Sequence, residues 1–227
     1  MKKFFTFIIC LALTAAATSC DDKEDTKKEG GSDDIGTCYI TVEGQRTDFD
    51  YAYLVSDEGE TITVFSTIDI LYYYKNPDKI KRGMMLSALS VYSNNELSGG
   101  EIPFGEYDLE FIPTIDYYEL FSDADESDYQ EYTTDTDPGY ESGPLKVTVL
   151  SDHSYKLEIA SLKLTYGYGD NDDEPKSTGT FYFEGKLTDA SSMVQMSSSD
   201  RSAMREVRDP GFGKWVKSLN RTAVSER

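Results

Sequence analysis

The sequence predicts an all-β fold, either an antiparallel β-sandwich or a small barrel of about eight strands. Runs rich in Val, Ile, Thr, Tyr and Phe recur between Gly36 and Asp189, and turn signals separate them. Convincing helical periodicity is absent between these runs. The chain has 227 residues, enough for one medium domain that buries a core without disulfide bonds. We assign this domain to residues 36–190.

Eight stretches have the composition or the alternation of strands, and 61–70 alternates most clearly. Residues 151–154 are expected to close a hairpin, and 162–166 to continue its second strand past a bulge at Ser161. A single helical turn is the most that residues 117–121 allow. In chain order the predicted strands are 38–42, a weaker stretch through 49–53, 61–70, 84–93, 107–112, 145–150, 155–160 and 178–187.

The amino terminus has the pattern of a secretory signal. A cationic start, Met1-Lys2-Lys3, precedes an apolar run over residues 4–17 that is too short to span a bilayer comfortably. The segment Ala17-Thr18-Ser19-Cys20 resembles a bacterial lipoprotein signal, in which the cysteine is acylated and becomes the first residue. Ala17 departs from the leucine usual three places before that cysteine, and an ordinary signal peptide is the alternative. The resemblance implies a signal peptide over 1–19 and lipidation, including palmitate, at Cys20.

Acidic residues follow Cys20 at once and begin a tether over residues 20–35. Such a stretch has little apolar surface to bury, so we expect it to be flexible. Residues 21–25 resemble the surface-export signals of Bacteroidota-type lipoproteins. The resemblance implies an outer-membrane protein held by its lipid, because two or more acyl chains give stable anchoring. Display on the cell surface and location on the periplasmic face both stay open.

Cysteine content and net charge exclude several function classes. Cys10 leaves with the signal and Cys20 carries lipid, so only Cys38 remains as a thiol and no internal disulfide can form. Because Cys38 lies in a predicted strand, we expect a buried structural thiol. The formal net charge is −20, which disfavours binding to nucleic acid because the phosphates would be repelled.

Residues 83–145 contain no Lys or Arg and fifteen Asp or Glu, and the centre of this stretch is rich in tyrosine. This centre, residues 116–141, reads as a loop, and a loop of this length is typically functional or disordered. One interpretation is a glycan-binding surface, in which Tyr faces stack on sugar rings and carboxylates accept hydroxyl hydrogen bonds. A solvated loop whose tyrosines lie against the sheet is the second interpretation. The candidate ligand-binding residues are Tyr117, Tyr118, Tyr129 and Tyr132.

Calcium is the third interpretation, because this cation prefers clustered carboxylate and carbonyl oxygens. No other cofactor is predicted. Neither cluster matches the EF-hand loop, since the required glycine and the final glutamate are missing. The candidate ligands are Asp123, Asp125 and Asp128 in one cluster and Asp170 and Asp172 in the other.

Catalytic chemistry finds little support in the sequence, and we predict that the protein is not an enzyme. The single histidine, His153, falls in the predicted 151–154 turn, and no serine can be tied to it.

The tail 191–227 differs from the rest, because residues 194–227 hold seven Lys or Arg against four Asp or Glu. We expect a partly helical or disordered tail, or a basic arm that docks on the acidic loop or on a partner.

The signal, the acidic tether and one β domain together resemble the β-sandwich lipoproteins of Bacteroidota-type genomes. The residues that carry this resemblance are Cys20 with its acidic followers, the 39–44 opening and the closing segment 179–185. The predicted function is a membrane-anchored, non-enzymatic binding module for a glycan or another surface ligand, including a surface protein. The alternatives are a structural or assembly subunit of the fimbrial type, completed by a terminal segment, and a small hydrolase.

Overall fold

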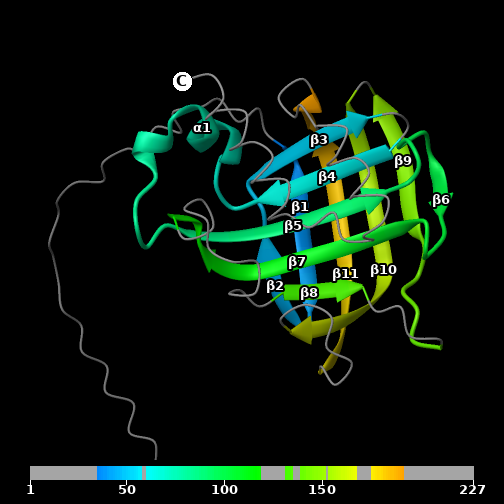
Figure 1. Cartoon of the computed structure of the whole chain (residues 1–227). Coiled ribbons are helices and arrows are strands. Elements are labelled where there is room, and N and C mark those ends of the chain that lie inside the picture. Colours follow the sequence, from blue (N-terminus) through cyan, green and yellow to red (C-terminus); the bar gives the residue numbers. More distant parts are fainter. Residues whose placement is uncertain are drawn as a thin grey trace, which may run out of the picture. The chain divides into compact units, whose positions relative to one another are not determined.

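A computed structural model describes residues 35–57, 60–118, 131–134, 139–151, 153–167 and 175–191. The fold is all-β, as predicted: the described residues form one curled sheet with very little helix (Figure 1). Its strands are β1 (Thr37–Val42), β2 (Gln45–Asp48), β3 (Tyr51–Asp57), β4 (Glu60–Ser66), β5 (Met85–Ser93), β6 (Gly100–Ile102), β7 (Tyr107–Asp116), β8 (Glu131–Thr134), β9 (Leu145–Ser151), β10 (Ser154–Gly167), β11 (Lys176–Lys186) and β12 (Thr188–Asp189).

The sheet follows the order β12-β3-β4-β5-β7-β8-β10-β11-β1-β2, and β9 pairs with both β10 and β6. Among these strands β12 and β3 run parallel, and the other pairs are antiparallel. The chain passes from β2 directly into β3, where the Phe49 amide donates to Cys38 O and the Asp50 amide to Ser66 O. In Figure 1, β3, β4, β5 and β7 therefore run across β1, β10 and β11. Among the described strands β12 and β2 end the order without pairing with each other, so this single curled sheet is a partly open barrel rather than two separate sheets.

Several predicted details are confirmed by the strand pairing. The register between β10 and β11 shifts between Ile159 and Leu162, which is the expected bulge. Ser151 pairs with Ser154, so β9 and β10 form the expected hairpin, with His153 at φ 54 in its turn. At the β1–β2 turn, Glu43 and Gly44 both have positive φ, as a two-residue hairpin turn of the I′ type requires.

The predicted strand over 61–70 is wrong at its end. β4 stops at Ser66, and α1 (Ile70–Lys75) follows, with the 3₁₀ turn η1 (Pro77–Lys79) behind it. Asp69 explains the change, because its carboxylate accepts a hydrogen bond from the Tyr72 amide at 2.8 Å and caps the helix. Within the described residues no helix is long and apolar enough to cross a membrane.

The inner face of the sheet carries the main hydrophobic cluster. Phe65 lies at its centre with no exposed surface, in contact with Phe49, Phe181 and Phe183. The Cys38 thiol belongs to the same cluster and is 3% exposed, as expected for a structural thiol. Large side chains thus fill the interior, as in other small barrels.

The outer face is buried over one half of the sheet and open to solvent over the other. On β3, β4, β5 and β7 a second cluster forms between outward-facing side chains such as Val64 and Ile112 and the α1 and η1 segment, with Ile70 and Ile80. The outward side chains of β1, β11 and β10 are exposed or half-buried Thr, Lys, Glu and Tyr. This difference decides which outward-facing tyrosines are in contact with solvent.

Candidate functional site

Several residues that the sequence singles out lie outside the described residues. These are Cys20, Tyr129, the calcium candidates Asp123, Asp125 and Asp128, and Asp170 and Asp172. Within the described ranges no group of three His, Cys, Asp or Glu side chains is arranged to hold a metal ion. The two candidate calcium clusters nevertheless adjoin neighbouring positions in the sheet. Glu131, the first residue of β8, follows the first cluster in sequence, and Gly167, the last residue of β10, precedes the second, and these two residues pair.

Among the other predicted tyrosines, Tyr117 is buried, whereas Tyr118 is only partly buried. Tyr117 is 1% exposed in the outer cluster, and this burial raises the pKa of its phenol. Tyr118 packs against the same cluster, with the Arg82 guanidinium 5.3 Å from its ring centroid. Tyr117 therefore offers almost no surface to a ligand, whereas a role of Tyr118 in ligand binding stays a prediction, on a different cluster from Tyr132.

Tyr132 is the predicted residue that the structure places in a suitable position. It lies on β8 opposite Phe111 of β7, and the two rings stack with centroids 5.8 Å apart. On its other side Tyr166 of β10 lies directly opposite, with ring centroids 4.4 Å apart. Tyr132 packs on the inner cluster but is only partly buried. The row of rings formed by Phe111, Tyr132 and Tyr166 therefore lies where the interior of the sheet meets solvent.

The carboxylate of Glu43 lies within electrostatic range of Tyr132. Burial raises the pKa of Tyr132, and the neighbouring Tyr166 and Glu43 raise it further. Glu43 is held in the β1–β2 turn, where its Oε1 accepts from the amide of Thr178 at 2.6 Å. The two tyrosine rings therefore form the edge of an aromatic wall, and the charge of the held Glu43 carboxylate reaches one of them. Phenols and a carboxylate can hydrogen-bond to a hydroxyl-bearing ligand.

Tyr166 and Glu43 were not among the predicted site residues. Tyr166 stood in a predicted strand and Glu43 in a predicted turn, and neither belongs to the acidic stretch. The strand alternation placed Leu162, Leu164 and Tyr166 on one face, which was the available local signal. Their meeting with Tyr132 depends on strand register over long sequence separations, which no local pattern contains.

A second tyrosine pair stands on the solvent-exposed outer face. Tyr39 of β1 and Tyr182 of β11 stack with centroids 5.4 Å apart and planes 18° from parallel. Arg46 lies 3.8 Å from the Tyr39 centroid, and the Lys156 ammonium lies 5.3 Å from that of Tyr182. The cations thus cover the ring faces at both ends of the stack. We interpret this row as a support for the sheet exterior rather than as a place for a ligand to stack.

The stack makes a prediction for alkaline pH. The Tyr182 hydroxyl donates to the Glu184 carboxylate, and this bond, with burial and nearby charges, raises the pKa of Tyr182 to about 12. Since the folded-state pKa lies above the ordinary value of about 10, the stabilisation is present below pH 10 and is lost as pH rises toward 12. We expect Glu184→Gln to lower the pKa of Tyr182. The phenolate absorbance of each protein minus that of its Tyr182→Phe counterpart measures this pKa, and an unchanged midpoint contradicts the assignment.

Neither reactive side chain of the domain lies at the tyrosine site. Burial, with a smaller contribution from Asp48, raises the pKa of the Cys38 thiol well above its usual value, which makes it a poor nucleophile. His153 lies in the β9–β10 turn, whereas Tyr166 lies near the other end of the long strand β10.

No protein-family model, no characterised protein and no solved structure matches the chain.

Proposed function

We propose that the protein is a lipid-anchored, extracytoplasmic binding module without catalytic activity, and that it contacts a glycan or a similar hydroxyl-rich surface ligand at the Tyr132–Tyr166 site. One observation carries the proposal: two partly exposed tyrosines lie with their ring centroids 4.4 Å apart where the interior meets solvent, and the charge of Glu43 acts on one of them. The signal-like start and the acidic tether support an outer-membrane location.

The chemistry of the site suits a neutral sugar better than the other ligand classes. A sugar ring offers hydroxyls that donate to a carboxylate and accept from phenols, and C–H groups that pack against an aromatic wall. An anionic ligand is disfavoured, because the negative charge of Glu43 acts on Tyr132 and the whole chain carries a formal charge of −20. Hydrolysis of a glycoside commonly needs a pair of carboxyl groups, whereas among the described residues one carboxylate, that of Glu43, acts on Tyr132, which favours binding over hydrolysis.

Binding by the soluble unit Ser32–Arg227 on a broad panel of neutral and acidic glycans tests this proposal. We expect binding to neutral glycans, and a loss of about tenfold in affinity when Tyr132→Phe and Tyr166→Phe remove both hydroxyls but keep the rings. Calorimetric titration measures the loss.

Tyr140→Phe is the matched control. This tyrosine lies beside the same strands, but its hydroxyl donates to Ser177 O at 3.0 Å, and its ring contacts Lys163 and Lys176. Its substitution is expected to leave glycan affinity unchanged. Equal affinity in all variants contradicts the assigned site, and absence of binding across the panel contradicts the glycan itself.

A further inference from the structure

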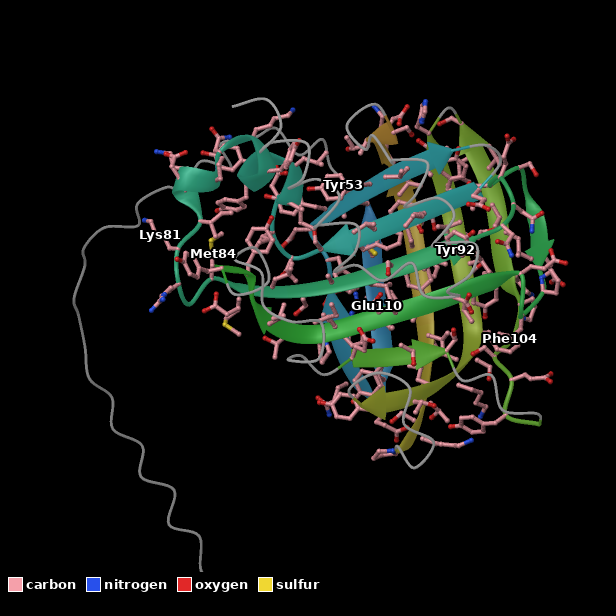
Figure 2. The ribbon with its side chains drawn as sticks, in the orientation of Figure 1. Tyr53, Lys81, Met84, Tyr92, Phe104 and Glu110 are labelled. Carbon is pink, nitrogen blue, oxygen red and sulfur yellow. The ribbon has the colours of Figure 1, made fainter. Side chains whose placement is uncertain are left out.

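Strand β9 is paired along its whole length on one edge and along only part of the other. On the second edge β6 pairs with residues 145–147, and among the described strands none besides β10 pairs with residues 148–151. Gly99 has φ 100, which departs from strand geometry, so the pairing of β6 begins only at Gly100. From there β6 leads the other way, toward Phe104 in the lower part of Figure 2. We call residues 148–151 on this side the open edge of β9.

The open edge carries no charge and is apolar at its centre. It reads Thr-Val-Leu-Ser, and all four residues are exposed. Val149 continues the inward row of Leu145 and Val147, which are 1% and 4% exposed, yet it is itself 47% exposed. Leu150 is 51% exposed, and among the described residues Met85 is the only other exposed large apolar side chain. An uncharged edge of this composition favours pairing with another strand.

The two ends of the strand order are protected by other means. β2 carries Arg46 and Asp48, which form an exposed ion pair, and β12 is only two residues long. Charged side chains and short length are the usual ways in which native proteins protect a sheet edge. The open edge of β9 has neither, which indicates that a further segment covers it.

The strands β9 and β11 finish at the same end of the sheet (Figure 1). Ser154 of β10 lies opposite both Ser151 of β9 and Lys186 of β11. The Leu187 amide then donates to His153 O, in the β9–β10 turn, at 2.8 Å. The chain therefore leaves β11 close to the point where the open edge ends.

The basic tail, residues 192–227, begins from a fixed point at this end. The Ser191 Oγ accepts a hydrogen bond from the Ser56 amide at 2.9 Å, and the Ser191 amide donates to Asp189 Oδ1 at 2.9 Å. The first eight residues of the tail, Ser-Met-Val-Gln-Met-Ser-Ser-Ser, contain no charge, no Gly and no Pro. Such a segment can pair along an uncharged edge without burying a charge.

The predicted tether is the rival occupant, because it meets the domain at the same end. Ile35 O accepts from the Lys186 amide at 3.3 Å. Of the fourteen residues 21–34, however, ten are charged and two are glycine. Charged residues and glycine disfavour strand pairing, so composition selects the tail.

Length and direction also suit the tail. The distance to cover is short, because Asp189, at the start of the tail, lies within electrostatic range of His153 in the β9–β10 turn. If four of the residues 192–199 pair with the open edge, the other four provide a link of about 13 Å. The tail starts where β9 finishes, so it would run antiparallel to β9, as β6 does beside residues 145–147.

Attachment to the same chain favours the tail over a separate partner. Four paired residues form a small interface compared with the roughly 1,000 Å² of a stable complex between separate chains. A segment tethered by a few residues has an effective concentration of about millimolar, so that a small interface suffices. The occupant that these observations select is therefore the tail in cis.

We infer that residues 192–199 add an antiparallel strand to the open edge of β9, with their apolar side chains beside Val149 and Leu150. The open edge lies beside the first half of β10, whereas Tyr166 lies near the other end of that strand. The inference therefore stands independently of the proposed ligand.

Hydrogen exchange at the amides of residues 148–151 tests the inference in the soluble unit Ser32–Arg227. Alternate amides of a strand face opposite edges, so those that face away from β10 depend on the tail for protection. Gln195→Pro combined with Met196→Pro is expected to speed their exchange at least about tenfold, because adjacent prolines at the centre of the segment remove a donor in either register. Ser218→Pro, elsewhere in the tail, is the matched control and is expected to change nothing. Equally fast exchange in the unmodified unit and in the double-proline variant overturns the inference.

Disulfide formation identifies the chain that donates the strand. With Leu150→Cys and Met196→Cys in the same unit, we expect a disulfide within one chain, and the buried Cys38, 3% exposed, does not compete. A disulfide between two chains contradicts docking in cis and indicates the tail of a second copy. Met85→Cys in place of Leu150→Cys is the matched control, because Met85 is similarly exposed and lies beside Met84, far from Phe104 in Figure 2. Equal disulfide yields in the two pairs contradict the assigned edge.

Discussion

Gly185→Ala is expected to prevent the domain from folding. A Cβ atom added at Gly185 would lie 1.6 Å from the carbonyl oxygen of Ile35 and 2.6 Å from its carbonyl carbon. Both are backbone atoms, so no flexible side chain can move aside. Gly36 makes the reciprocal approach, because its Cβ would lie 2.1 Å from Glu184 O. Relief of these contacts requires the chain before β1 to separate from β11.

The expected loss exceeds about 4 kcal/mol, a large part of the 5–15 kcal/mol by which a domain of this kind is stable. Circular dichroism melting of the soluble unit Ser32–Arg227 measures it. Gly143→Ala is the matched control, since its new Cβ would meet Ser161 at an ordinary 3.5 Å. A melting temperature for Gly185→Ala equal to that of the control contradicts the close approach.

This contact also links the fold to the proposed anchor. Ile35 ends the predicted tether, is 9% exposed in the inner cluster, and accepts a hydrogen bond from the Lys186 amide at 3.3 Å. Any segment that precedes it therefore enters the domain at a fixed point on β11. A tether attached there would hold the barrel by a central strand rather than by a loop.

Local patterns predicted the strands that contain enough β-branched and aromatic residues to alternate. β1, β5, β10 and β11 belong to this group, and their period of two is visible without the structure. β6 and β12 are three and two residues long, which is too short for an alternating pattern to be recognised in the sequence. β8, with the sequence Glu-Tyr-Thr-Thr, has the composition of the acidic stretch around it. It is a strand because β7 and β10 pair with its two edges.

The candidate site was only partly accessible to the same reasoning. Tyr117 and Tyr132 stand in similar acidic surroundings, and no local signal separates them. Tyr117 is buried because its amide donates to Met84 O at 2.8 Å, which holds it beside the outer cluster. Tyr132 lies on the inner face and at the end of the interior. Which side of a sheet a residue occupies follows from register, and register was not available from the composition.

Phe65→Ala is expected to cost about 3–5 kcal/mol. Phe65 has no exposed surface, and its ring centroid lies 5.1 Å from that of Phe183 and 5.3 Å from that of Phe181. The loss combines the transfer free energy of the ring with the cavity that remains, because the surrounding barrel can relax only in part. Urea denaturation measures it as a lower midpoint at unchanged slope. Phe65→Leu, which keeps most of the volume, is expected to lose clearly less.

The same variant tests whether the ligand site lies outside the barrel interior. If the interior is filled, the unmodified domain has no room for a small apolar molecule, whereas Phe65→Ala creates a dry cavity lined by phenylalanines. Benzene is then expected to raise the melting temperature of Phe65→Ala and to leave that of the unmodified domain unchanged. Stabilisation of the unmodified domain by benzene contradicts a filled interior. It would move the search for the natural ligand from the Tyr132–Tyr166 edge into the barrel itself.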